Sequence, residues 1–502
     1  MFSKVLVANR GEIAVRIMRT LREMGVGSVA IYSDADAAAL HVLCADEAVG
    51  LGDPEPAASY LNAARIVAAA RETGAEAIHP GYGFLSENAA FARLVEAAGL
   101  AFIGPPAEVI ALLGDKLQAR RLAAEQGVPT IPGRTLPGGA EPQALARAAT
   151  EVGYPVLVKA AYGGGGKGMR VVRSEADLAA AASLAASEAH SAFGEGTVYL
   201  ERFLARPRHV EIQILGDARG EVVPLGEREC SIQRRYQKII EETPSPALDA
   251  ALRARLFEAA VAVARAAGYV NAGTVEFLLD ADGRFYFLEV NTRLQVEHPI
   301  TELVLGLDLV RHQLEIAAGA PLRITERELA ARGHAIECRV YAEDPARGFV
   351  PAPGRIRFMQ AAAGPGVRFD AGVYAGFEVP VHYDPLLGKL VVWAEDRPAA
   401  LARMERALRE NVILGVPTTT ELTLDVISSE AFRAGDTHTR LLEELLQGWR
   451  PSADADRWAL VGEAADRLLG FAAAAPGATG RGPAGGEPAS PWQALGAWDY
   501  TR

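Results

Sequence analysis

Cysteine, long apolar runs and excess positive charge are all scarce in this 502-residue chain. Its three cysteines, Cys44, Cys230 and Cys338, are not spaced as zinc ligands and are too few for a disulfide framework, so we expect a reducing, cytoplasmic setting. No signal peptide is visible, and no stretch of about 18 apolar residues predicts a membrane span. The net charge of −12 argues against a nucleic-acid-binding protein.

Lysine is scarce as well, because only six of the 51 basic residues are lysines. They are Lys4, Lys116, Lys159, Lys167, Lys238 and Lys389. A genome rich in G and C explains the general preference for arginine. The remaining lysines are candidates for roles that arginine cannot fill, since an ammonium is a compact point charge and a guanidinium is a planar fork.

The N-terminal part of the sequence alternates short apolar strands with helices. We expect strands at 4–8, 28–32, 77–79 and 101–103, and helices at 12–24, 61–71 and 91–98. This alternation predicts an α/β nucleotide-fold domain with a parallel sheet. A dinucleotide-binding motif is not predicted, because Asn9-Arg10-Gly11 after the first strand contains a single glycine.

The rest of the chain is predicted to be α+β and to contain further domains. We expect a helix at 117–126, mixed strands from 154 onward, and an antiparallel sheet in the last folded segment, with helices at 398–410 and 438–447 packed on it. The Ala-, Gly- and Pro-rich stretch 471–490 predicts a linker or disordered tail. The predicted domains are 1–114, 115–330 with a lid at about 131–204, 334–447, and a tail at 448–502.

A glycine-rich loop lies between two apolar strands at 155–159 and 169–172. It consists of Gly163, Gly164, Gly165, Gly166, Lys167 and Gly168. Consecutive glycines let the backbone approach a phosphate, although a Walker A loop is excluded because no Ser or Thr follows Lys167 and the next element is a strand. The loop is therefore interpreted as a mobile nucleotide lid, with an ordinary hairpin turn as the alternative.

A predicted hairpin joins the strands 274–280 and 285–291. If Asp282 and Gly283 form a two-residue turn, Glu276 faces Glu289 across the hairpin. Opposed carboxylates repel each other, and a Mg²⁺ or Mn²⁺ ion between them would remove that repulsion. The same register puts Leu278 and Phe287 on the Glu276 face, as apolar cover for a nucleotide base.

Polar residues continue at every second position after this hairpin, at Glu289, Asn291, Arg293, Gln295 and Glu297. If the chain stays extended, they share one face, because side chains alternate along a strand. We interpret the face as a site rather than as the solvated side of an amphipathic strand, because it combines unbalanced Glu with Asn and Arg.

Three other segments carry isolated candidates. Within 230–238, an extended chain would put Gln233 on one face, and Tyr236 and Lys238 on the other. His209 is equally compatible with a structural and a functional role. Arg339 is a cation inside an apolar strand, which favours a functional role.

Together these motifs resemble the biotin carboxylase family of the ATP-grasp superfamily over residues 1–447. The resemblance lies in ANRGEIA (8–14), HPGYGFLSEN (79–88), GDK (114–116), VKAAYGGGGKGMR (158–170), RHVEIQ (208–213), ECSIQRRYQKIIEE (229–242) and EVNTRLQVEHPITE (289–302). Two departures are Tyr236, where several relatives have His, and Arg202, where Lys is frequent.

The resemblance implies a role for each candidate residue. ATP would be bound by Lys116, Lys159, the loop 163–168, Glu201, Arg202, Phe203, Leu204, His209, Gln233, Tyr236 and Leu278. Mg²⁺ would be held by Glu276, Glu289 and Asn291. Bicarbonate would be bound by Lys238, Arg293, Gln295 and the Val296 backbone. Glu297 would be the general base, and Arg339 would stabilise negative charge on biotin.

The implied activity is ATP-dependent carboxylation of biotin by bicarbonate through carboxyphosphate, the first half-reaction of an acetyl-CoA carboxylase or another acyl-CoA carboxylase, with fatty acid biosynthesis as one setting. Biotin would be attached to a carrier protein, because no lysine here follows a methionine as in the usual Met-Lys-Met site. Expected partners are this biotin carboxyl carrier protein, a carboxyltransferase that selects the final acceptor, and a second copy in a homodimer.

Two other functions remain open from the sequence. Another ATP-grasp ligase, joining an acyl phosphate to an amine, would share the lid and the metal hairpin but leave RLQVEHP and Arg339 unexplained. A nucleotide-sensing scaffold with an inactive site would have lost Glu276, Glu289, Lys238 or Arg293, and all four are present.

Overall fold

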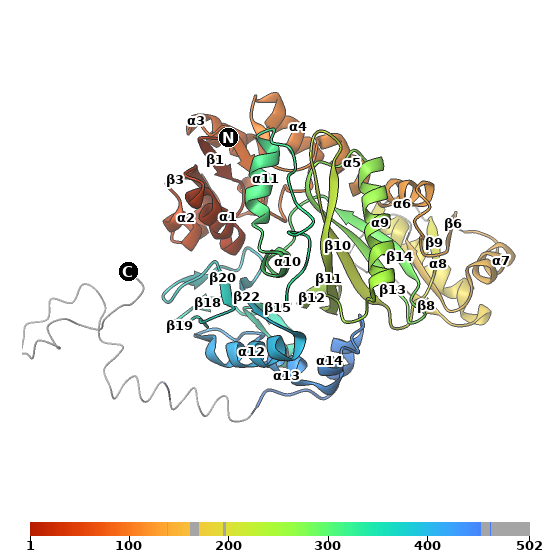
Figure 1. Cartoon of the computed structure of the whole chain (residues 1–502). Coiled ribbons are helices and arrows are strands. Elements are labelled where there is room, and N and C mark those ends of the chain that lie inside the picture. Colours follow the sequence, from red (N-terminus) through yellow and green to blue (C-terminus); the bar gives the residue numbers. More distant parts are fainter. Residues whose placement is uncertain (138, 161–169, 194–196, 453–461, 463–502) are drawn as a thin grey trace, which may run out of the picture. The chain divides into compact units, whose positions relative to one another are not determined.

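The N-terminal segment folds into a parallel sheet, as its alternating pattern predicts. The computed structural model describes residues 1–137, 139–160, 170–193, 197–452 and 462. The sheet has five parallel strands in the order β3 (Glu47–Gly52), β2 (Gly27–Ser33), β1 (Lys4–Val7), β4 (Ala77–His79) and β5 (Ala101–Phe102). The helices that accompany it are α1 (Gly11–Glu23), α2 (Leu40–Cys44), α3 (Ala63–Glu72), α4 (Ala89–Ala97) and α5 (Ala107–Gly114) (Figure 1).

An eight-stranded antiparallel sheet forms the centre of the fold. Its order is β14 (Phe285–Asn291), β13 (Asn271–Leu279), β10 (Arg208–Gly216), β11 (Val222–Arg234), β12 (Gln237–Thr243), β15 (His334–Tyr341), β22 (Leu386–Ala394) and β20 (Val367–Ala371). The antiparallel strands expected within 334–447 are present, yet they continue this sheet, because β15 pairs with β12.

The two faces of the central sheet differ in chemistry. One face is mostly apolar and packs on α9 (Ala250–Ala266), α12 (Arg397–Glu410) and α13 (Thr420–Ser428). Since side chains alternate along a strand, the opposite face receives His209 and Glu211 from β10 and Glu276 from β13. We call this second surface the polar face. The helix α10 (His298–Leu305), followed by α11 (Leu309–Ala317), packs along its central strands.

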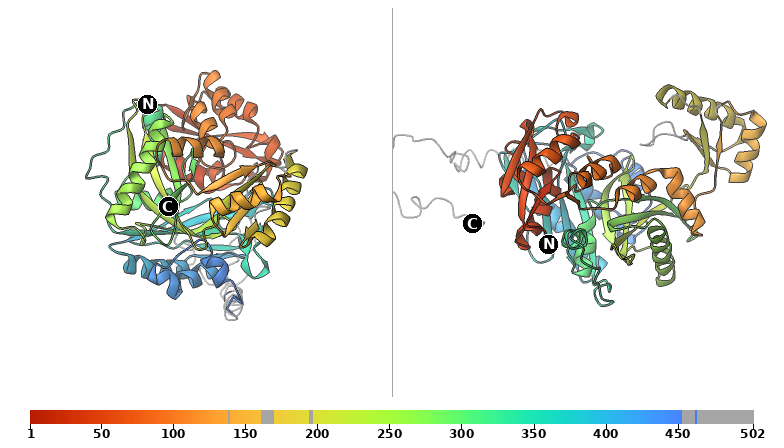
Figure 2. Two further views of the ribbon diagram at one scale, coloured as in Figure 1. Left: turned by 90° about the vertical axis from the view of Figure 1, so that its right-hand side faces the viewer. Right: turned by 90° about the horizontal axis from the view of Figure 1, so that it is seen from above.

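A smaller antiparallel sheet occupies the segment expected to be the lid. Its order is β6 (Gly133–Leu136), β9 (Val198–Arg202), β7 (Val156–Ala160) and β8 (Arg170–Val172). The helices α7 (Pro142–Val152) and α8 (Glu175–Phe193) lie beside this sheet (Figure 2). They share one apolar core with it. The predicted phosphate loop, Gly163–Gly168 with Lys167, lies outside the described residues.

The remaining elements are short or connect these sheets. They are α6 (Lys116–Glu125), η1 (Asp34–Asp36), η2 (Pro56–Ala58), η3 (Pro345–Arg347), β16 (Glu343–Asp344), β17 (Val350–Pro351), β18 (Gly354–Arg355), β19 (Phe358–Gln360), β21 (Glu378–Val379), β23 (Val412–Leu414), α14 (Glu430–Ala434) and α15 (Leu441–Leu445). Most of the predicted tail, 453–461 and 463–502, lies outside the described residues. Among the helices of the described part, none is long and apolar enough to cross a membrane.

The parallel sheet and the central sheet meet through a close backbone contact. Gly372, directly after β20, lies against the start of α1, and a Cβ atom on it would come within 2.5 Å of the Glu12 backbone nitrogen. Nearby, Arg16 of α1 and Arg368 of β20 both bind the Glu302 carboxylate, at 2.7 and 2.8 Å. The contact fixes α1, and with it Glu12, against the central sheet.

We expect Gly372→Ala to lower the free energy of unfolding by about 1–3 kcal/mol, because backbone atoms cannot yield to the added methyl group as a flexible side chain would. Thermal and denaturant unfolding would measure the change. Gly114→Ala is the matched control, since a Cβ there meets no atom within 4 Å. A Gly372→Ala protein as stable as the control would contradict the tight contact.

Candidate active site

The hairpin that carries the opposed glutamates has a different turn from the predicted one. Leu279 pairs with Phe285, and a three-residue loop at 281–283 replaces the two-residue turn. A β-bulge at Leu288 then shifts the register, so that Glu276 still faces Glu289. The prediction that these two carboxylates oppose each other is therefore correct, although the predicted turn is wrong.

The bulge also changes which apolar residues accompany Glu276. Phe287 pairs with Phe277 and packs in the core on the opposite face, so its predicted position beside Glu276 is wrong. Leu278 does lie on the polar face, opposite Tyr286. Together with Leu204 and Ile131, they form a small apolar cluster next to the site.

Three glutamates line up across neighbouring strands of the polar face. Glu211 on β10 lies directly opposite Glu276 on β13, and Glu276 lies opposite Glu289 on β14. Glu211 and Glu276 are almost completely buried. Because adjacent like charges destabilise a sheet, this row requires cations close by.

Cations surround this row of carboxylates. Arg228, fully buried on β11, donates to Glu211, and His209 Nε2 lies 2.9 Å from Glu276 Oε2. Lys116 Nζ lies 2.9 Å from Glu289, whose charge raises the pKa of that ammonium. Burial alone would raise the pKa of Glu276, but Lys238 and His209 hold it below its usual range. Glu276 is therefore an ionised carboxylate.

The segment that carries Lys238 forms a hairpin rather than the extended strand expected from the sequence. Arg235 and Tyr236 form its turn and both have positive φ, 50° and 69°. Gln233 consequently pairs with Lys238, and the two residues share the polar face instead of opposite faces. Tyr236 lies at the turn with 65% of its surface exposed.

Lys238 connects the two halves of the site. Its ammonium donates to Glu276 at 2.8 Å, to Glu297 at 2.7 Å and also to Glu211. The desolvation of this buried amine would lower its pKa, but the three carboxylates raise it well above its ordinary value. A permanent positive charge therefore lies between the metal-ligand candidates and the predicted base.

Glu297 has both oxygens engaged by cations. Besides Lys238, Arg339 donates to it at 2.9 Å, and Arg339 also donates to Glu241 at 2.7 Å. Although Glu297 is fully buried, which favours the neutral acid, Lys238 and Arg339 hold its pKa well below the usual range. Glu297 is thus an ionised carboxylate.

The polar residues that follow β14 contact one another, although the chain there is not extended. The strand ends at Asn291, and the next residues form an irregular segment and a turn before α10. Arg293 nevertheless donates to Asn291 at 3.1 Å and to Gln295 at 2.8 Å. Asn291 and Gln295 in turn donate to Glu276, at 2.8 and 3.3 Å. The expected extended geometry is wrong, but the residues do meet.

The predicted nucleotide residues outside the glycine loop lie either in the small antiparallel sheet or next to the polar face. Lys159 Nζ contacts Glu201 at 2.6 Å, and the backbone amides of Arg202 and Phe203 donate to Pro132 and Pro155. Lys116, at the start of α6, contacts Glu289 instead. His209 and Gln233 lie together on the polar face, with Gln233 Nε2 3.3 Å from His209 Nδ1.

Several residues of the site were not identified from the sequence. Glu87 holds Arg293 at 2.9 Å from a position 206 residues away, which no local pattern reveals. Glu211 could have been found, since it lies two positions after His209 on a strand. Arg228 lies between Glu227 and Glu229, and Glu241 precedes Glu242, so no isolated charge singles them out as one did for Arg339.

Comparison with known proteins identifies the family. Residues 1–110 match the family described as "Biotin carboxylase, N-terminal domain", 115–325 match "Carbamoyl-phosphate synthase L chain, ATP binding domain", and 337–444 match "Biotin carboxylase C-terminal domain". A curated biotin carboxylase from Nostoc sp. is 52% identical over 88% of this chain and 99% of its own. The chain belongs to the biotin carboxylase family.

Other members of the biotin carboxylase family also resemble the chain. A pyruvate carboxylase subunit of Methanothermobacter thermautotrophicus is 52% identical over 89% of this chain and 91% of its own. The biotin carboxylase domain dimer of Hydrogenobacter thermophilus 2-oxoglutarate carboxylase, crystallised with MgADP, ADP and bicarbonate, is 47% identical and superposes with a TM-score of 0.81, covering 88% of this chain and 98% of that one. The same biotin carboxylase fold thus serves carboxylases with different acceptors.

The donor set of this biotin carboxylase site suits magnesium. Glu276 and Glu289 are cross-strand partners, and the Asn291 amide lies beside Glu276. Hard oxygen ligands of this kind are the ones that Mg²⁺ prefers. Glu289 also keeps a third of its side chain exposed, which leaves it accessible to an ion that arrives with a nucleotide.

The buried Glu241 predicts a pH dependence of stability in this biotin carboxylase. Burial raises its pKa to about 7 against the opposing effect of Arg339. The folded protein therefore binds the Glu241 proton more tightly than the unfolded chain does. The contribution of this proton to the stability of the folded state is complete below the unfolded pKa of 4.5, and it is lost as the pH rises to about 7.

Glu241→Gln should therefore gain stability relative to the wild type between about pH 5 and pH 8, by on the order of 2 kcal/mol. Melting temperatures measured across this range would show the trend. Asp370→Asn is the control, since Arg368 holds the pKa of the buried Asp370 below its usual range and its titration lies outside the window. If the stability difference between Glu241→Gln and the wild type did not change with pH, the elevated pKa of Glu241 would be disproved.

Proposed function

We propose that the chain is the biotin carboxylase component of a biotin-dependent carboxylase. It uses ATP and bicarbonate to carboxylate biotin attached to a carrier protein. The observation that carries this proposal is the set of contacts made by Lys238, whose ammonium bridges Glu276 and Glu297. One residue thereby joins a metal-phosphate site to a proton acceptor, as expected for an enzyme that phosphorylates bicarbonate.

The proposed bicarbonate site combines cations with neutral hydrogen-bonding groups. Arg293, Gln295 and the Val296 backbone lie between Asn291 and the base Glu297 in the chain, and Arg293 is oriented by Glu87. We propose that Arg293 and Lys238 bind the anion. Glu297 accepts the bicarbonate proton as a bicarbonate oxygen attacks the γ-phosphorus of ATP, and ADP leaves with the electrons of the broken P–O bond.

The carboxyphosphate formed in this way breaks down to CO₂ and phosphate. The phosphate then takes the proton from the biotin ureido nitrogen, and that nitrogen attacks CO₂. Arg339, already fixed by Glu241 and Glu297, is proposed to face the ureido oxygen as negative charge develops there. Lys116 and Lys159 with the glycine-rich loop are proposed to bind the ATP phosphates, and residues 201–204 with Leu278 the adenine.

Glu276 and Glu289, with Asn291, are proposed to hold Mg²⁺. A bound divalent ion supplies Lewis-acid stabilisation of charge on the transferring phosphoryl group. The relative crystallised with MgADP and bicarbonate supports this proposal. In the structure described here, Lys116 and Lys238 balance the same carboxylates.

The other ATP-grasp ligase and the inactive scaffold explain less of the site. A ligase for an amine acceptor needs neither Glu297 nor Arg339 at the end of the cation series, yet the two residues contact each other at 2.9 Å. An inactive scaffold would not keep Glu276, Glu289, Lys238 and Arg293 assembled in one network, as they are here.

The partners we propose are a biotin carboxyl carrier protein, a carboxyltransferase and a second copy of the chain. The related domain that crystallised as a dimer supports the homodimer. Relatives with 52% and 50% identity are named as subunits of pyruvate carboxylase and of methylcrotonoyl-CoA carboxylase. We therefore propose that the carboxyltransferase sets the acceptor, with acetyl-CoA or another acyl-CoA, and hence fatty acid biosynthesis, as the expected setting. Three free cysteines suit a reducing, cytoplasmic location.

The test is bicarbonate-dependent ATP hydrolysis with free biotin, followed by detection of carboxybiotin from labelled bicarbonate. Glu297→Gln should lower carboxylation by at least about 100-fold while changing ATP affinity only a few-fold, because the base acts on bicarbonate. Glu227→Gln is a matched control, since Glu227 is a buried glutamate paired with Arg253 on the opposite face. An equal loss of ATP affinity in Glu297→Gln would show that the residue is structural.

A second test concerns the biotin itself. Because none of the six lysines follows a methionine, we expect the intact mass to gain no biotin after co-expression with a biotin ligase. A biotin-accepting carrier expressed in parallel verifies that the ligase is active. A biotinylated peptide from this chain would refute the proposal that the acceptor biotin belongs to another protein.

A further inference from the structure

Lys389 is a buried lysine for which the proposed mechanism gives no role. It lies in the middle of β22 with none of its side chain exposed, in a chain that otherwise prefers arginine. A completely buried ammonium is costly unless its surroundings compensate for the lost hydration. Its contacts should therefore reveal what it does.

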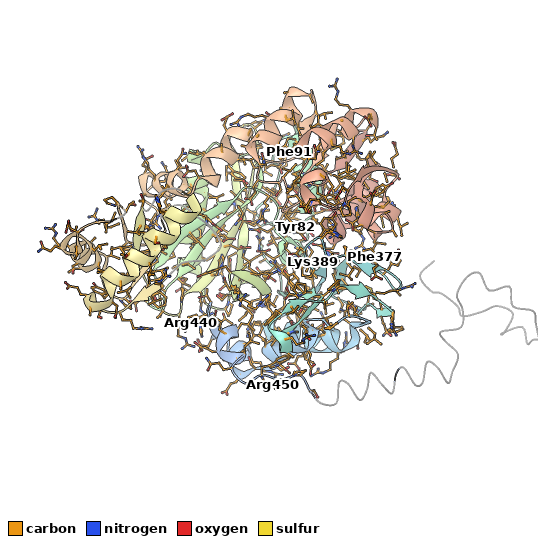
Figure 3. All side chains as sticks on the ribbon, turned by 180° about the vertical axis from the view of Figure 1, so that it is seen from behind. Tyr82, Phe91, Phe377, Lys389, Arg440 and Arg450 are labelled. Atoms are coloured by element: carbon orange, nitrogen blue, oxygen red, sulfur yellow. The ribbon has the colours of Figure 1, made fainter. Side chains whose placement is uncertain are left out.

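The ammonium of Lys389 connects two parts of the fold. Its Nζ donates to the backbone carbonyl of Val296 at 2.6 Å and lies 3.3 Å from Glu12 Oε1 of α1. The Tyr82 hydroxyl donates to the same Glu12 oxygen, and Lys389 also lies 5.8 Å from the centre of the Tyr82 ring. Figure 3 shows Lys389 and Tyr82 together in the interior.

The position of Lys389 in the sheet brings it next to the reacting groups. It is the direct cross-strand partner of Arg339, so the two cations share the polar face. Such a pair is unfavourable unless each cation has its own partners. Arg339 contacts Glu241 and Glu297, whereas Lys389 faces Glu12 and, on the neighbouring strand, Asp370.

The Val296 carbonyl belongs to the turn that presents the proposed bicarbonate residues. Gln295 precedes it, and Glu297 follows it just before α10 begins. Both side chains depend on the orientation of this peptide, because the turn lies between the end of β14 and the helix and belongs to neither. A donor on the Val296 carbonyl thus fixes the base and the anion site together.

We propose that Lys389 is a positioning residue that holds the Val296–Glu297 peptide in place for bicarbonate. It does so from a site formed by Glu12, Tyr82 and the sheet, and it does not touch the reacting atoms itself. The inference rests on the function proposed above. Glu12 is a firm support, since its backbone is in contact with Gly372 and its carboxylate is held by Tyr82.

An alternative role for Lys389 is only to neutralise the buried Glu12. The two roles can be separated, because Lys389→Met alone removes the donor to Val296 and also leaves Glu12 as an uncompensated buried charge. The double variant Glu12→Gln/Lys389→Met removes both charges, and the glutamine can still accept from Tyr82. Glu12→Gln alone is the matched control, since it retains the ammonium on Val296.

The experiment measures the steady-state kinetics of bicarbonate-dependent ATP hydrolysis with free biotin, together with melting temperature. We expect both variants that contain Lys389→Met to lose about 10- to 100-fold in kcat/KM for bicarbonate, as misplaced reacting groups do, with KM for ATP changed less than about 2-fold. The double variant should regain the melting temperature that Lys389→Met loses. Glu12→Gln weakens the support of Lys389 but keeps its ammonium, so it should lose less in kcat/KM for bicarbonate than either variant that contains Lys389→Met.

Recovery of bicarbonate kinetics in the double variant would overturn the inference, since neutralising Glu12 would then be the whole role of Lys389. An equal increase in KM for ATP would overturn it as well, because the effect would not be specific to the 295–297 turn. A wild-type protein with no bicarbonate-dependent ATP hydrolysis would overturn the proposed function, and this inference with it.

Discussion

The buried ammonium of Lys238 is the charge on which the rest of the site depends. The sheet aligns Glu211, Glu276 and Glu289 on three neighbouring strands, an arrangement that is unstable without cations. Lys238 reaches the first two and also Glu297, so one cation stabilises carboxylates that come from three separate segments of the chain. Removing it would take one cation from each of these buried carboxylates, which would then depend on Arg228, His209 and Arg339 alone.

The sequence predicted the broad fold because apolar periodicity is strong where strands and helices alternate. Strands β1, β2, β4 and β5 of the parallel sheet and helices α1, α3 and α4 followed from that pattern, whereas β3, α2 and α5 were not expected. The facing of Glu276 and Glu289 was also predicted. The hairpin shows the limit of such reasoning. A three-residue loop and a bulge at Leu288 offset each other, and neither leaves a signature that distinguishes it from a regular two-residue turn.

The position of Lys238 could not have been obtained in the same way. Its hairpin turns at Arg235 and Tyr236, whereas positive φ at two successive positions normally signals Gly, Asn or Asp. Tertiary contacts were equally hidden, since Glu87 and Arg293 are 206 residues apart, and Lys389 and Val296 are 93 apart. The residue types of the site were predictable, while the contacts between them required the fold.

The pairing of β12 with β15 has a consequence for how this protein can be divided. The boundary at 330–334 separates two segments of sequence but no two separate sheets, because Ile240 to Thr243 pair with Ala335 to Cys338. A fragment ending at 330 would expose the whole outer edge of β12, with a row of unpaired amide and carbonyl groups. Open edges of that kind recruit strands from other molecules and lead to aggregation. The C-terminal segment thus covers the edge of β12, the strand that would otherwise end the sheet of the ATP-binding segment. We therefore expect neither segment to be soluble as a separate domain.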